Sequence, residues 1–302
     1  MQLVIHCGAH KTGTSSIQSL LFEQRHELLK QGVLYISETQ LNRSGILQYL
    51  HRSSATISTR NSIRTKIERI LDKHRPEKVI VSHESIFSFV DIDQGSGDFY
   101  GSAPQSLRNL EFLGLDEIFS AIRAVLYVRR QDEFLQSLYM QNLSTGKWTN
   151  SFEQALDNID CTNISWLSYA IKLANFFGES NVMIRPFETI NDGWKNLIKD
   201  FCMATTIDVH DSLSEKKVNE SFSTPAYLAA LALMPLIHKT KARLRVAQTL
   251  KQALPPSIFG KATPLSDAVR LRILRELEKD NRELFTTFIK DYPEDFYAPN
   301  QV

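Results

Sequence analysis

Over roughly the first two thirds of the chain, short apolar runs alternate with longer segments whose apolar residues recur at helical spacing. This alternation is typical of βα units, in which helices connect strands that pair in parallel. The predicted strands are residues 3–7, 33–36, 78–82, 124–128 and 182–185. The helices predicted between them are residues 15–30, 62–74, 107–118, 132–144, 166–177 and 194–203. We therefore expect an α/β protein of three layers, with helices on both faces of a central parallel sheet of about five strands.

The pattern changes in the last third of the chain, where strand-like runs give way to helical spacing. Three further helices are predicted, at residues 226–237, 241–254 and 267–289. Pro255 and Pro256 end the second of these, because proline cannot continue a helix. No stretch rich in glycine and serine separates this part from the rest. We expect a single domain over residues 1–302, with an α/β core of about 1–205 and a helical C-terminal layer of about 206–302.

Composition and charge narrow the class of protein. Of the 302 residues, 42% are hydrophobic and 23% are charged, which excludes a disordered chain or a coiled coil. The 35 Lys and Arg against 34 Asp and Glu give a net charge of +1, so no nucleic-acid partner is expected. The most apolar run, residues 226–237, is too short to span a membrane. The sequence lacks a signal-peptide pattern and a C-x-x-C pair, so we expect a cytoplasmic protein with reduced thiols.

A glycine-bearing turn follows the first predicted strand and leads into a helix. The first N–H groups of a helix have no partner within the helix and carry partial positive charge, so such a turn binds anions. The candidate phosphate-binding residues here are Gly8, Lys11, Thr12, Gly13, Thr14, Ser15 and Ser16. Gly8 and Gly13 have the spacing of the Walker A pattern G-x-x-x-x-G-K-[ST], but Thr14 stands where that pattern has lysine. A nucleotide kinase is therefore the less favoured alternative.

A second candidate anion site follows the strand predicted at residues 124–128. Arg129 comes directly after this strand, and Ser137 lies eight residues further on, in the next helix. A guanidinium group can bind a terminal phosphate through two hydrogen bonds, and a serine hydroxyl adds a neutral donor. Ligands of open parallel α/β sheets bind at the carboxyl ends of the strands, where both candidate sites are expected. Two such sites predict a ligand with phosphate groups at both ends.

These two motifs together resemble a known family. The run Lys-Thr-Gly-Thr-Ser at residues 11–15 is similar to the 5′-phosphosulfate loop of sulfotransferases that use 3′-phosphoadenosine 5′-phosphosulfate (PAPS), and Arg129 with Ser137 resembles their 3′-phosphate site. Weaker similarities to bacterial members lie at residues 182–188 and 216–221, so the resemblance covers roughly residues 1–225.

The resemblance implies a fold of the P-loop type, PAPS as cosubstrate and adenosine 3′,5′-bisphosphate as product. It also implies that Lys217 lies in a segment that closes over the nucleotide. The acceptor is expected to be a hydroxyl or amine of a carbohydrate or small metabolite. No spacing of His, Cys, Asp and Glu indicates a metal site, and sulfuryl transfer needs none.

Sulfuryl transfer requires stabilisation of the leaving phosphate and a base for the acceptor proton. Lys11 is the candidate for the first role. For the base we favour Glu84, then His83, because both follow the strand at residues 78–82. Neighbouring side chains of an extended segment point in opposite directions, so at most one of the two would face the ligand. Glu38, after the strand at residues 33–36, is a competitor, since several sulfotransferases are similar in using a glutamate near that region.

Two basic clusters, at residues 51–75 and 239–245, are either solvated helix faces or a path for an anionic acceptor. The chain is either an active enzyme or a nucleotide-binding module that has lost catalysis. The oligomeric state is unknown. His10 and His51 are interpreted as surface or loop histidines.

Overall fold

The computed structural model describes residues 1–89, 99–157, 159–209 and 221–299. Within these residues it has a sheet of five parallel strands in the order β2-β3-β1-β4-β5. The strands are β1 (Gln2–His6), β2 (Val33–Ile36), β3 (Lys78–Ser82), β4 (Ala121–Val128) and β5 (Val182–Pro186). The predicted α/β class and the five-stranded parallel sheet are therefore confirmed. Because all strands run the same way, their carboxyl ends meet at one edge of the sheet, called here the carboxyl edge.

Helices connect the strands and form the C-terminal part. The helices up to β5 are α1 (Thr14–Glu23), α2 (Arg25–Lys30), α3 (Glu38–Ser44), α4 (Ile46–Leu50), α5 (Ile57–His74), α6 (Ala103–Leu113), α7 (Gln131–Ser144), α8 (Phe152–Leu156) and α9 (Trp166–Phe177). After β5 come α10 (Trp194–Thr205), α11 (Thr224–Leu233), α12 (Thr240–Ala253), α13 (Pro256–Phe259), α14 (Asp267–Glu276) and α15 (Glu278–Phe288). Short 3₁₀ helices are η1 (Leu115–Glu117), η2 (Cys161–Asn163), η3 (Glu179–Asn181), η4 (Phe187–Asp192) and η5 (Met234–Leu236).

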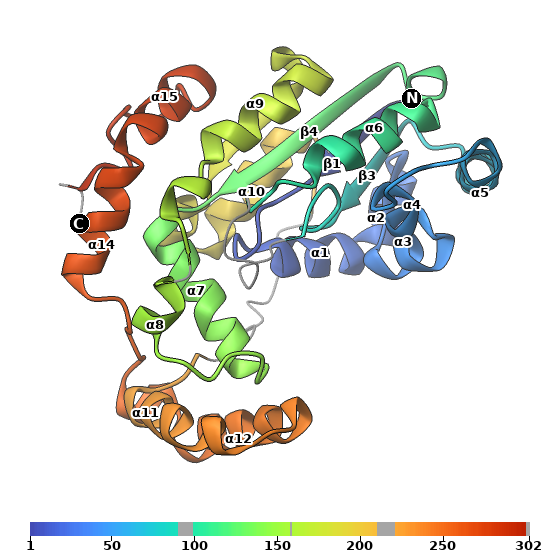
Figure 1. Cartoon of the computed structure of the whole chain (residues 1–302). Coiled ribbons are helices and arrows are strands. Elements are labelled where there is room, and N and C mark those ends of the chain that lie inside the picture. The colour runs from blue at the N-terminus through green and yellow to red at the C-terminus, as the bar shows by residue number, and fades with distance from the viewer. Residues whose placement is uncertain (90–98, 158, 210–220, 300–302) are drawn as a thin grey trace.

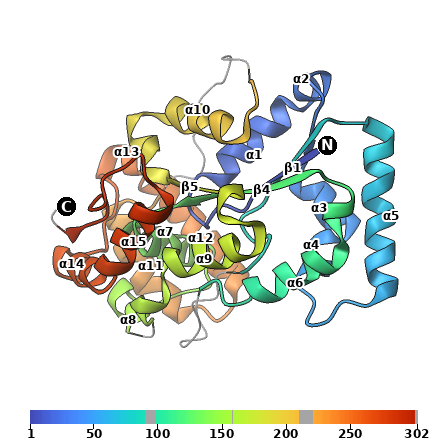
Figure 2. The same cartoon turned by 90° about the horizontal axis from the view of Figure 1, so that it is seen from above.

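The sheet is covered on both faces, as Figure 2 shows. Successive side chains of a strand point to opposite faces, so each strand contributes to two apolar layers. Val4 of β1 packs with Leu20 of α1 and Phe201 of α10 on one face. Ile5, its neighbour in β1, packs on the other face with α6 and with Leu173 of α9. This is the three-layer arrangement expected from the sequence.

The C-terminal helices pack on the helices that follow β4. Helix α14 contacts α7, α15 contacts α9, and α12 contacts α7. The buried side chains of Gln131 in α7 and Asn281 in α15 exchange two hydrogen bonds, of 2.6 and 3.2 Å. Arg270 of α14 forms an ion pair of 3.0 Å with the fully buried carboxylate of Asp132. The C-terminal part is thus fixed to the start of α7, directly beyond the carboxyl end of β4. None of the helices in the described ranges is long and apolar enough to cross a membrane.

Several predicted helix boundaries are wrong. The helix predicted at residues 15–30 is two helices, α1 and α2, and the one predicted at residues 267–289 is also two, α14 and α15. The breaks fall at Gln24 and Leu277, neither of which is a glycine or a proline. Four short helices, α3, α4, α8 and α13, were not predicted.

Candidate functional site

Three loops meet at the carboxyl edge, because β3, β1 and β4 are neighbours in the sheet. The loop after β1, residues 7–13, contains Lys11; the loop after β3 contains Glu84; and Arg129 follows β4 directly. Nη1 of Arg129 donates a hydrogen bond of 3.3 Å to the carbonyl oxygen of Lys11. The structure therefore brings together the two predicted anion sites, which are far apart in the sequence.

The loop after β1, called here the phosphate loop, has an unusual backbone. Lys11 has a φ of 66° and Gly13 a φ of 75°, and a left-handed conformation is rare for lysine. The hydroxyl of Thr12 donates to the carbonyl of Ala9 at 2.5 Å and fixes the turn. Within the described residues, the backbone N–H groups of residues 11–15 donate no hydrogen bond to another backbone or side-chain group. A loop with left-handed residues and free N–H groups is the form of an anion-binding nest.

The two glycines of the phosphate loop are needed for space. A Cβ atom on Gly8 would lie 2.8 Å from Nε2 of His6 and 2.9 Å from Oγ1 of Thr14. A Cβ atom on Gly13 would lie 2.9 Å from the Phe187 ring. Oγ1 of Thr14 is buried and has no hydrogen-bond partner in the described part of the chain. The first residue of α1, directly after the loop, therefore holds a hydroxyl group without a partner among the described residues. Ser15 is exposed and Ser16 half-buried at the start of α1.

Several neighbouring residues contact Arg129 and fix its position. Its Nη2 donates a hydrogen bond of 2.7 Å to the carboxylate of Glu133, and its guanidinium lies 5.3 Å from the centre of the Phe187 ring. Burial raises the pKa of the Glu133 carboxyl, but this hydrogen bond and the charges of the neighbouring arginines together outweigh it and lower that pKa. Nε1 of Trp166 donates to the carbonyl of Arg129 at 2.6 Å. Nε of Arg129 is buried and unpartnered among the described residues. Ser137 lies half-buried in α7.

The candidate bases cluster beyond β2 and β3. Oε2 of Glu84 accepts a hydrogen bond of 3.4 Å from Gln18 of α1, and Gln18 also donates to the carbonyl of Ser82 at 3.0 Å. His83 is buried; its Nδ1 accepts from the backbone N–H of Ser85 at 3.0 Å. Its Nε2 lies 4.0 Å from Oε1 of Glu38 at the start of α3. The structure thus places His83 with Glu38, and it places Glu84 against α1.

Electrostatic effects connect Glu84 to the phosphate loop. Burial is the main cause that lowers the pKa of Lys11, the charge of Arg129 lowers it further, and the carboxylate of Glu84 opposes the shift. The charge of Lys251, on α12, also lowers the pKa of Lys11. Nζ of Lys251 donates to Oγ of Ser144 at 2.7 Å. No pattern in the sequence indicates that a lysine of the C-terminal layer lies within electrostatic range of this loop.

His10 and His51 both lie in turns between regular elements, as predicted for loop histidines, but both are half-buried and contact the loop after β3. Nε2 of His10 lies 3.1 Å from Oγ of Ser85, and burial lowers the pKa of its imidazole to about 4. Nε2 of His51 lies 2.7 Å from the carbonyl oxygen of Ser85. His10 is thus a neutral imidazole between the phosphate loop and the loop after β3. Its place directly before Lys11 was the signal in the sequence. The predicted nucleotide contact at Lys217 lies outside the described residues.

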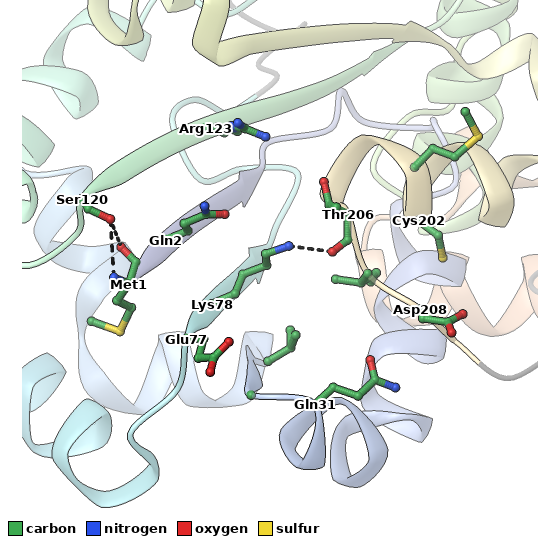
Figure 3. Close-up of a pocket in the computed structure, with 14 residues that line it drawn as sticks. Met1, Gln2, Gln31, Glu77, Lys78, Ser120, Arg123, Cys202, Thr206 and Asp208 are labelled. Atoms are coloured by element: carbon green, nitrogen blue, oxygen red, sulfur yellow. Dashed lines mark hydrogen bonds between the residues drawn. The ribbon is translucent and has the colours of Figure 1, made fainter.

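A groove of about 1080 Å³ lies at the opposite edge of the sheet (Figure 3). It is lined by the amino ends of the strands, including Gln2 and Lys78, and by Thr206 after α10. Nζ of Lys78 donates to the carbonyls of Thr205 and Thr206, at 2.9 and 2.6 Å. The ammonium group therefore caps the end of α10. None of the predicted site residues lies in this groove.

No family model matches the sequence, and no curated protein matches it. Among solved structures, the chain is similar to a sulfotransferase from Alicyclobacillus acidocaldarius, with 13% identity, 86% of this chain and 96% of that chain covered, and a TM-score of 0.43. It is also similar to the sulfotransferase domain from the curacin biosynthetic pathway, with 10% identity, 92% and 96% covered, and a TM-score of 0.37. Both likenesses are distant, and it is the geometry of the carboxyl edge that bears on function.

Proposed function

We propose that this chain is a sulfotransferase that moves the sulfuryl group of PAPS to a hydroxyl or amine of a carbohydrate or small-metabolite acceptor. The observation that carries the proposal is the pairing of two anion sites at neighbouring strand ends. The backbone N–H groups of residues 11–15 donate to no group among the described residues, and Arg129 after β4 reaches the carbonyl of Lys11 at 3.3 Å. A ligand with phosphate groups at both ends of one ribose fits such a pair.

The residues present fit this cosubstrate. The free N–H groups of the phosphate loop and the unpartnered hydroxyl of Thr14 would hold the 5′-phosphosulfate. Arg129, whose buried Nε has no partner among the described residues, would hold the 3′-phosphate together with Ser137. All of these groups are hydrogen-bond donors, as phosphate oxygens require.

The chemistry assigned to the side chains follows from their positions. The acceptor oxygen or nitrogen attacks the sulfur atom of PAPS. A bond between the acceptor atom and sulfur forms as the bond between sulfur and the 5′-phosphate oxygen breaks. The Lys11 ammonium group would stabilise the negative charge that develops on that leaving oxygen. The Glu84 carboxylate would accept the acceptor's proton, because Glu84 follows β3, the neighbour of β1 in the sheet, and its negative charge acts on Lys11 and His10. Gln18 would orient the carboxylate through its hydrogen bond.

Calorimetric titration of the whole chain tests the proposed ligand class. We expect adenosine 3′,5′-bisphosphate to bind at least about tenfold more tightly than AMP, because only the first ligand uses both sites. PAPS should support transfer to an acceptor without magnesium. Tighter binding of ATP with magnesium, accompanied by transfer of its terminal phosphate, would instead establish the kinase alternative.

Replacement of Glu84 by glutamine tests the base. We expect kcat to fall by about 10²-fold or more, with little change in the affinity for adenosine 3′,5′-bisphosphate, because the amide cannot accept a proton. Glu38→Gln and His83→Gln are the matched variants, and each should retain most of the activity. If Glu38→Gln loses more activity than Glu84→Gln, the base belongs to the pair formed by Glu38 and His83. If the native chain binds the nucleotide but turns over no acceptor, it is an inactive binding module.

A further inference from the structure

The segment of residues 221–266 has an extreme charge composition. It contains six Lys and Arg and no Asp or Glu. Because the whole chain has a net charge of +1, the remaining residues carry a net charge of −5. The basic residues of the segment are Lys239, Lys241, Arg243, Arg245, Lys251 and Lys261. Such an asymmetry orients a molecule in an electric field, with this segment facing an anionic partner.

The same segment exposes large apolar side chains. They are Leu228 and Leu233 of α11, Leu236 of η5, and Ile258 and Phe259 of α13. Leu236 is 76% exposed and Ile258 is 72% exposed, and α11 contacts both η5 and α13. These five side chains are called here the apolar patch. Large apolar side chains exposed on elements that contact one another mark an interaction surface.

Helix α11 is apolar around its whole circumference. Ala226 and Ala230 form the side that packs against the rest of the protein, and Leu228 lies on the opposite side. A helix of this kind in water is normally buried. Leu228, the member of the apolar patch on this outer side, is therefore left for a partner to cover.

Exposed cations flank the apolar patch. Lys239 follows Leu236 by three residues, and Lys261 follows Phe259 by two. Lys239, Lys241, Arg245 and Lys261 are all exposed. Arg243, in contrast, donates to the carbonyls of Ile237 and Gly146. Four cations are thus available to a partner, and Arg243 holds α12 in place.

The position of these helices suits an extended flat partner. In Figure 1, α11 and α12 form the lowest layer of the molecule, below α7 and α8 and away from the sheet. The groove at the amino ends of the strands lies elsewhere and includes none of the apolar patch.

We propose that the apolar patch and the cations that flank it bind the surface of a lipid bilayer that contains anionic lipids. Apolar side chains enter the boundary of the acyl chains, and lysine and arginine stay at the level of the headgroups. A second copy of this chain is a poorer occupant, because a two-fold contact would bring two such basic segments together. The inference is independent of the reaction catalysed.

Cosedimentation of the full chain with vesicles tests this inference. We expect binding to vesicles of phosphatidylcholine with phosphatidylserine, and much weaker binding to phosphatidylcholine alone. Binding should fall at about 1 M salt, where the screening length is about 3 Å. The variant Lys239→Gln/Lys241→Gln/Arg245→Gln should lower the partition coefficient by about 100-fold. The variant Leu236→Ser/Ile258→Ser/Phe259→Ser should lower it by about 100-fold or more without a change in charge.

The matched control removes three exposed cations elsewhere, as Arg52→Gln/Arg69→Gln/Lys73→Gln. Two of these lie on α5, on the far side of the molecule (Figures 1 and 2). This control should keep at least about one third of the native partition coefficient. Equal binding to both kinds of vesicle, or an equal loss in the control, would overturn the proposal. So would self-association in sedimentation velocity that the apolar variant abolishes, because the patch would then belong to a second copy.

Discussion

Replacing Lys11 with alanine should reduce kcat for sulfuryl transfer by about 10²- to 10³-fold or more, which is the loss typical when one preorganised donor to a developing anion is removed. The structure gives two reasons for an effect of this size. Lys11 lies in a loop whose backbone is fixed by Thr12, and the Arg129 guanidinium touches its carbonyl. Burial and the neighbouring Arg129 charge lower the pKa of Lys11, so its ammonium group is poorly solvated and gains most from a developing negative charge.

The fold should survive this substitution. Lysine at a φ of 66° already bears the strain of a left-handed conformation, and alanine bears about the same strain. The thermal unfolding midpoint is therefore expected to stay within about 3 °C. Lys30→Ala is the control, because Lys30 is exposed on α2 and pairs only with the neighbouring Glu27 in the described structure. Activity of Lys11→Ala within about twofold of the native value would remove Lys11 from the catalytic site.

The sheet could be predicted from the sequence because its strands are buried on both faces. Residues 33–36 and 78–82 are nearly continuous apolar runs, and their predicted limits agree with β2 and β3. The carboxyl ends of parallel strands share one edge, so the meeting of Lys11, Arg129 and Glu84 followed from the topology. The separation of the two anion sites in the sequence was no obstacle to this inference.

The helix boundaries were less accessible, because packing sets them. The apolar spacing of a helix continues through Gln24 and through Leu277 in the sequence, yet a helix ends at each of them. After Gln24, α2 packs against β2. Two of the missed helices did have a local signal. Ser37 and Gln40 form a capping box at the start of α3, and a second capping box starts α8.

The features of the site that could not be predicted from the sequence depend on contacts between residues far apart in the chain. The burial of His10 depends on Ser85 and Tyr100, both more than 70 residues away. The approach of Lys251 to the phosphate loop depends on how α12 packs on α7. The left-handed conformation of Lys11 also had no local signal, since that conformation favours glycine.

Replacing Arg129 with alanine should weaken the binding of adenosine 3′,5′-bisphosphate by about 30- to 1000-fold, the range for loss of one partner of a desolvated charge pair. The binding of AMP, which lacks the 3′-phosphate, should change by less than about threefold. The reason is that the Arg129 guanidinium has a buried Nε without a partner among the described residues, as well as two paired nitrogens. Calorimetric titration of both nucleotides against both proteins measures the difference.

Glu133 affects this measurement because it binds the same guanidinium group, and it also provides a second test. In the free protein its carboxylate accepts from Nη2 of Arg129 at 2.7 Å, so a 3′-phosphate must compete for the same guanidinium. Glu133→Gln should therefore tighten the binding of adenosine 3′,5′-bisphosphate by about threefold to tenfold, because the amide is a weaker competitor. The double variant Arg129→Ala/Glu133→Gln removes the repulsion that an unpaired carboxylate would exert on the phosphate. If this double variant still loses affinity for the bisphosphate and not for AMP, Arg129 itself binds the 3′-phosphate. Equal losses for the two nucleotides would mean that Arg129 only supports the phosphate loop through the carbonyl of Lys11, and the two-site interpretation would be wrong.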